Sequence, residues 1–67
     1  MFGDAVRRER VRLKFSQEEL AARAGLDRSY MGQVERGETN ISLLNLVKIA
    51  DALGVGPERL VEGLSLQ

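Results

Sequence analysis

The sequence contains neither cysteine nor histidine, and these two absences remove much of the common catalytic and metal-binding chemistry. Disulfide bonds, thiolate or imidazole metal sites, and catalytic triads that need Cys or His are all excluded. The carboxylates are scattered over the predicted helices, so the sequence predicts no enzyme and no cofactor. Only a pocket that holds a carboxylate of perturbed pKa would reverse this prediction.

Long apolar runs and strand signals are missing as well. The longest apolar run is Leu20 to Ala22, far too short for a membrane span or a signal peptide. β-Branched and aromatic residues are few, and no apolar–polar alternation persists. Hydrophobic residues still make up 43% of the 67 residues, enough for one compact core. We therefore expect a single all-α domain over 1–67, located in the cytoplasm, with no membrane partner and no small-molecule ligand.

An excess of one charge is also absent, since ten Lys and Arg balance ten Asp and Glu. Zero net charge counts against a nucleic-acid binder, which usually carries a basic face. The distribution is uneven, however. Residues 1–36 carry eight basic and six acidic side chains, whereas residues 37–67 carry two and four. The first half is therefore the part suited to face phosphate.

Capping residues divide the chain into five predicted helices. Ser16 and Glu19 form an S-x-x-E capping box at a helix start, and glycines follow the predicted helix ends. Asp27 and Ser42 are further N-cap candidates. The predicted helices are 4–14, from Ser16 to the stop at Gly25, 28–36, from the cap at Ser42 to about Leu53, and from Pro57 through Glu62.

One charged residue falls on an apolar stripe of the first predicted helix. Phe2, Val6 and Leu13 share this stripe at 100° per residue, and Arg10 lies on it as well. A charge on a buried face must be paired. Arg10 therefore needs a carboxylate from another part of the chain.

Apolar residues of the fourth predicted helix cover more than half of its circumference. Leu44 and Ile49 lie on opposite sides of one apolar stripe, and further apolar residues follow near the C-terminus. The stripe consists of Leu43, Leu46, Val47, Ala50 and Leu53. A domain of this size buries only about 60% of its unfolded surface. We expect the surplus to form a symmetric dimer interface in the region of about 42–66; the alternative is that these leucines cap the monomer's own core. The expected interface residues are Leu44, Ile49, Leu60, Val61 and Leu64.

The second and third predicted helices have the spacing of a helix-turn-helix unit over 17–36. Ala21 is small where the two helices would cross, and Gly25 lies in the tight turn. Met31 and Val34 then occupy the buried face of the third helix. Together, between correctly placed caps, these features are fairly specific for this motif.

The opposite face of the third predicted helix carries residues that can read DNA. Arg28, Ser29, Gln33 and Arg36 share it, and Arg and Gln are side chains that read base edges. Gly32 also falls on this face, although a helical glycine costs about 1 kcal/mol relative to alanine. Either the missing side chain lets the helix approach a groove closely, or the glycine is simply tolerated at an exposed position.

The stretch FSQEELAARAGLDRSYMGQVERGETNISLLNLVKIADALGV, over 15–55, resembles the Cro/cI (XRE) family of repressors. DRSYMGQVERG followed by NISLLNLVKIADAL is most similar to controller proteins of restriction–modification systems. The resemblance implies a compact, five-helix, lambda-repressor-like domain that binds double-stranded DNA through its third helix, usually as a homodimer. It also implies that Arg10 pairs with Glu35. Unlike many relatives, this chain has Glu38 rather than a basic residue after the third helix.

The resemblance implies base contacts from the third helix and a phosphate contact from Gln17, and the other backbone candidates are expected from their positions in the sequence. Base-edge contacts are expected from Arg28, Ser29 and Gln33. Two backbone candidates have rival interpretations: packing is the favoured one for Tyr30, and Arg36 could form an ion pair instead. Backbone contacts are expected from Ser16, Gln17, Tyr30, Arg36, Asn40 and Ser42.

These residues are compatible with two classes of function. The favoured one is a transcription regulator, associated with the nucleoid, that reads a pseudo-palindromic operator. The alternative is an antitoxin-like module that mainly binds another protein, which the surplus leucines and zero net charge favour. The face formed by Arg28, Ser29 and Gln33 argues for DNA reading as the main role.

Overall fold

Five α-helices and no strand make up the computed structural model over the residues it describes, 2–61. The all-α fold expected from the sequence is confirmed. No helix within this range is both long and apolar enough to cross a membrane. The helices are α1 (Phe2–Arg12), α2 (Gln17–Ala24), α3 (Arg28–Glu35), α4 (Leu43–Leu53) and α5 (Pro57–Val61).

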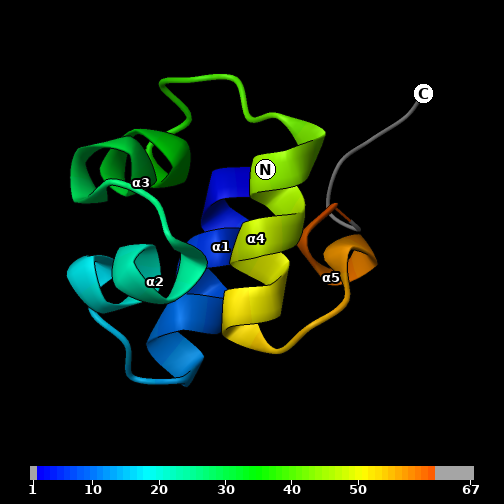
Figure 1. Ribbon diagram of the computed structural model, residues 1–67. Coiled ribbons are helices and arrows are strands. Elements are labelled where there is room, and N and C mark those ends of the chain that lie inside the picture. Colours follow the sequence, from blue (N-terminus) through cyan, green and yellow to red (C-terminus); the bar gives the residue numbers. More distant parts are fainter. Residues whose placement is uncertain (1, 62–67) are drawn as a thin grey trace.

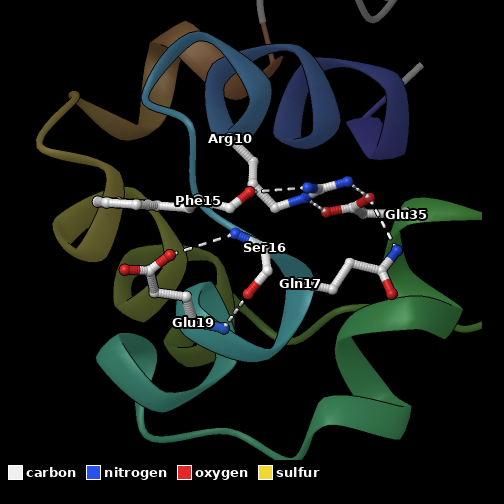
Figure 2. Close-up of polar contacts among 6 residues, drawn as sticks. All are labelled: Arg10, Phe15, Ser16, Gln17, Glu19 and Glu35. Carbon is white, nitrogen blue, oxygen red and sulfur yellow. Dashed lines mark hydrogen bonds and ion pairs between the residues drawn. The ribbon is translucent and has the colours of Figure 1, made fainter.

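The predicted caps set the starts of α2, α3 and α4. Ser16 accepts a hydrogen bond from the backbone N–H of Glu19 at 3.0 Å, and the Glu19 carboxylate accepts one from the Ser16 N–H at 3.3 Å (Figure 2). This is the complete capping box. Asp27 accepts from the N–H of Ser29 at 2.9 Å, and Ser42 caps α4 in the same way. Each cap satisfies a backbone donor that the helix itself leaves unpaired.

The first helix is displaced by two residues from the prediction, spanning Phe2–Arg12 rather than 4–14. Its end is fixed by Lys14, which adopts a left-handed backbone with φ of 63°. The N–H of Phe15 then bonds to the carbonyl of Arg10 at 3.1 Å and closes the helix. The sequence did not indicate this end, because glycine, the usual residue for the left-handed conformation, is absent there.

The start of the first helix is equally constrained. Gly3 is buried, and a Cβ at this position would lie 2.6 Å from the carbonyl oxygens of both Val34 and Glu35. The first turn of α1 therefore rests directly on the end of α3. Glu62, the predicted last residue of the fifth helix, lies outside the described residues.

Helices α1 and α4 occupy the centre of the molecule, with α2 and α3 on one side and α5 on the other (Figure 1). Helix α1 packs against α3, α4 and α5, and α2 packs against α3 and α4. The helix-turn-helix pair therefore has its inner side on the core and leaves the outer side of α3 free. The core consists of Ala5, Val6, Leu20, Ala21, Ala24, Met31, Val34, Ile49, Ala50, Leu53 and Leu60.

Two predicted interface residues belong to this core. Ile49 and Leu60 are fully buried within the single chain, so their assignment to a surface that binds a second copy was wrong. The predicted stripe of α4 included Leu43 and Val47, but both are exposed. Because α1, α2 and α5 all pack against α4, they cover the side that contains Ile49.

The other expected interface residues have different outcomes. Leu44 is 63% exposed and Leu43 75%, so the N-terminal part of α4 presents apolar surface to solvent. Val61 is half-buried at the end of α5. Leu64 lies outside the described residues, as does much of the C-terminal part of the region 42–66.

Candidate nucleic-acid interface

An ion pair between α1 and α3 lies beneath the candidate interface. Arg10 Nε lies 2.6 Å from Glu35 Oε2, and Arg10 Nη2 donates to Glu35 Oε1 at 3.0 Å (Figure 2). The side chains are only 13% and 3% exposed. The hydrogen bond to Glu35 raises the pKa of Arg10, partly opposed by burial. Glu35 thus supplies the carboxylate that the apolar stripe required.

Gln17 joins the same network at the first position of α2. Its amide nitrogen donates to Glu35 Oε1 at 3.0 Å (Figure 2). One carboxylate on α3 therefore accepts hydrogen bonds from both α1 and α2. Gln17 was expected only at the DNA backbone. Its hydrogen bond to Glu35 could not be predicted, because only the folded arrangement of three helices creates it.

A shallow groove runs along α3 beside the start of α2. Arg28, Ser29, Gln33 and Arg36 are exposed along it. The structure therefore brings together the expected base-reading residues with Gln17, expected at the backbone. The groove is lined by Gln17, Arg28, Ser29, Gly32, Gln33 and Arg36.

Gly32 is covered by its neighbours rather than open to solvent. A Cβ at this position would lie 3.0 Å from Arg36 Nη1 and 3.6 Å from Gln17 Oε1. The expectation that Gly32 is an exposed position was therefore wrong for the free protein. The end of Arg36 lies against the space that a side chain would occupy, so an added methyl group would make a tight contact with it.

Arg36 makes the ion pair that the sequence left open as its alternative. Its Nε lies 3.0 Å from Glu38 Oε2, and both side chains are more than half exposed. Their mutual hydrogen bond raises the pKa of Arg36 and lowers the pKa of Glu38. An acidic residue after α3 thus contacts the basic residue at its end.

Tyr30 packs against the core from α3 and is tied to α4. Its hydroxyl accepts a hydrogen bond from Asn45 Nδ2 at 3.0 Å. In the free protein, Tyr30 therefore has the packing role that was favoured for it. Asn40 is exposed in the loop between α3 and α4, and Ser42 is exposed at the end of this loop. The Ser42 hydroxyl accepts a hydrogen bond from the Asn45 N–H at 3.1 Å.

A second buried carboxylate, Glu9, was not expected from the sequence. Glu9 has a side chain only 6% exposed, contacts Arg12 Nη2 at 2.9 Å and lies 3.7 Å from Arg59 Nε. This cluster connects α1 to α5, on the side away from α3 (Figure 1). The three-residue spacing of Glu9 and Arg12 could have predicted their ion pair, whereas nothing in the sequence indicated that Arg59 lies near Glu9.

Comparisons with known proteins agree with this geometry. A family model described as helix-turn-helix matches residues 6–60. The control protein C.BamHI of Bacillus amyloliquefaciens is 44% identical over 63 residues, which is 92% of this chain and 78% of that protein.

Two solved structures are similar over nearly the whole chain. The restriction–modification controller protein C.AhdI of Aeromonas hydrophila is 51% identical with a TM-score of 0.87, covering 88% of this chain and 89% of that one. SinR, a master regulator for biofilm formation solved in complex with DNA, is 34% identical with a TM-score of 0.85, covering 91% and 98%.

Proposed function

This chain belongs to the helix-turn-helix family of transcription regulators, and from that premise we propose that it binds specific double-stranded DNA sites through α3. The observation that carries the proposal is the groove where Arg28, Ser29 and Gln33 lie exposed beside the start of α2. The major groove of B-DNA admits an α-helix and presents a distinct pattern of donors and acceptors for each base pair.

Each exposed side chain of α3 has a chemical partner on a base edge. Arg28 can donate two parallel hydrogen bonds to guanine O6 and N7, and Gln33 can pair with adenine N6 and N7. Ser29 can donate or accept at either. The core residues of α3 hold these three side chains on one rigid face.

The start of α2 supplies a backbone contact. Gln17 has two amide hydrogens, of which one is donated to Glu35. The second can bond to a phosphate, reinforced by the positive end of α2. Phosphate contacts fix the register of the protein on DNA and carry no base information. Further phosphate contacts are assigned to Ser16, Tyr30, Asn40 and Ser42, whose hydroxyl or amide hydrogens serve as donors.

A homodimer completes the proposed reader. One α3 can contact only a few base pairs, whereas two such helices about 34 Å apart can enter successive major grooves on one face of the duplex. The exposed apolar residues Leu43, Leu44 and Val47 of α4, with Val61 of α5, supply surface for two-fold pairing. We propose a pseudo-palindromic operator as its target.

The relatives suggest which genes such a regulator serves. Several proteins similar to this chain are control proteins of restriction–modification systems. Two of them, C.BamHI and C.AhdI, are similar to it over most of their own length. We propose that this chain is a controller protein of the same kind, acting in the cytoplasm on nucleoid DNA.

Selection of bound sites from random duplex DNA tests the proposal, followed by two variants measured on the selected site and on random DNA. Arg28→Ala should cost about 1–3 kcal/mol on the selected site and relax one base preference. Gln17→Ala is the matched control and should weaken both duplexes about equally. Failure of the wild type to enrich any sequence would falsify the proposed function; equal losses for Arg28→Ala would withdraw Arg28 alone.

The exposed leucines of α4 also favour a second candidate, an antitoxin-like module that mainly binds another protein. The two candidates differ in their response to salt. Binding to DNA should weaken steeply and log-linearly with added salt, because each phosphate contact releases counterions. Retention on a DNA column that does not change between low and physiological salt favours the protein-binding module.

A further inference from the structure

The position of Arg36 over Gly32 indicates a specificity determinant beyond the three residues already assigned. We infer that Arg36 reads a base edge in the DNA site, in the place of the side chain that Gly32 lacks, and that Glu38 positions it. This inference rests on the proposed function and deepens it. It replaces the sequence-based assignment of Arg36 to the DNA backbone.

Helix geometry explains why Arg36 reaches this place. Side chains on an α-helix lean toward its N-terminus, so a residue covers the turn four positions before it. Arg36 follows Gly32 by four, and its Nη1 lies 3.0 Å from where a Cβ of residue 32 would be. A larger residue at 32 would compete for this space. The glycine thus admits a guanidinium into the groove that also contains Arg28 and Gln33.

Glu38 fixes one end of the guanidinium. Its Oε2 lies 3.0 Å from Arg36 Nε, whereas the atom over Gly32 is Nη1. The terminal nitrogens of the planar fork can therefore face guanine O6 and N7 while Nε stays with Glu38. The carboxylate also offsets the positive charge of Arg36, so random phosphates gain less from this residue than from an unpaired arginine.

Charge and shape can be separated by replacing Arg36 with lysine. Arg36→Lys keeps the positive charge but loses the planar fork. It should bind random DNA within about twofold of the wild type and retain its salt dependence, because the charge count is unchanged. On the selected site it should lose about tenfold or more and relax the preference at one base pair of each half-site. Unchanged affinity and base preference for Arg36→Lys overturn the inference.

Two further variants test the neighbours of Arg36. Gly32→Ala should shift the guanidinium by a few tenths of an ångström and weaken the preference at the same base pair as Arg36→Lys, with thermal melting as the check that α3 remains folded. Glu38→Gln should raise the affinity for random DNA severalfold and reduce the ratio of specific to random binding. If Gly32→Ala and Glu38→Gln leave base preference and this ratio unchanged, the roles given to these two residues are wrong.

The outcomes distinguish this inference from the proposed function. A wild-type protein that enriches no DNA sequence overturns both. A wild type that selects a site, with Arg36→Ala weakening selected and random DNA by the same factor, overturns only the reading role of Arg36.

Discussion

Glu35 connects three helices through hydrogen bonds to its carboxylate. Its carboxylate accepts hydrogen bonds from Arg10 of α1 and from Gln17 of α2. A buried ion pair need not stabilise a fold relative to apolar residues, but removing one partner leaves the other charge uncompensated. The stability of the domain and the position of a proposed DNA contact therefore meet at one carboxylate.

Replacing Arg10 with methionine tests this dependence. Because Glu35 would then keep a buried charge, we expect the free energy of unfolding to fall by about 3–5 kcal/mol. Urea denaturation followed by circular dichroism measures the change. The double variant Arg10→Met, Glu35→Leu is the control and should recover part of the loss, since neither charge remains. A loss below about 1 kcal/mol for Arg10→Met contradicts a structural role for the pair.

The exposed pair of Arg36 and Glu38 makes a prediction about titration. Arg36 lowers the pKa of Glu38 through a hydrogen bond, so the pair forms above the ordinary pKa of a glutamate and is lost as the pH falls through the lowered value. In the variant Arg36→Gln the pKa of Glu38 should rise to its ordinary range. NMR titration of the Glu38 carboxyl carbon measures both values. An unchanged pKa in the variant means that the contact does not persist in solution.

At the scale of helices, the sequence predicted where helices start better than it predicted which of their faces are buried. Ser16, Asp27 and Ser42 were found as caps because their side chains satisfy donors within their own helix start. The buried face of α4 was predicted only in part, because its apolar residues cover more than half of the circumference: Ala50 and Leu53 of the predicted stripe are buried, whereas Leu43 and Val47 are exposed. Only the helices packed around α4 decide that Ile49 faces the core while Leu43 faces solvent.

The candidate site shows the same division. The exposed face with Arg28 and Gln33 followed from periodicity within α3. The placement of Arg36 over Gly32 and the bond from Gln17 to Glu35 depend on side-chain conformation and on contacts between helices. Periodicity carries no information about either, so these features could not be derived from spacing.

The contact between α1 and α3 predicts a sensitive position. A methyl group in Gly3→Ala would meet the backbone carbonyl oxygens of Val34 and Glu35 at 2.6 Å, so the two helices must separate. We expect a loss of about 1–3 kcal/mol in the free energy of unfolding, measured by urea denaturation. Arg7→Ala, on the exposed face of α1, is the control and should change stability by at most about 0.5 kcal/mol. Equal effects of the two substitutions argue against this close contact.

At the scale of the whole molecule, the exposed apolar residues of α4 predict assembly. Leu44→Asp places a charge in the proposed interface, where an unpaired buried charge is strongly unfavourable. Sedimentation equilibrium at micromolar concentration should therefore give a dimer mass for the wild type and about the 7.4 kDa of the single chain for the variant. The variant should also bind a half-site but lose the additional affinity for the full operator.

Val11→Asp provides the control for this experiment. Val11 is an exposed valine on α1, outside the proposed interface, so its replacement should leave the dimer intact. A wild-type mass that stays at the monomer value, or an equal effect of the two substitutions, argues against an interface on α4.

The junction at Glu35 also has a consequence for genetics. Arg10 lies on α1, behind the proposed DNA-reading face, yet it shares a carboxylate with Gln17, which lines that face. A screen that collects loss of regulation should therefore recover substitutions at position 10 along with those on α3. Suppressors of such alleles should arise at position 35, because an apolar residue there removes the stranded charge. The map of defective alleles should thus extend from α3 to α1, in the centre of the molecule.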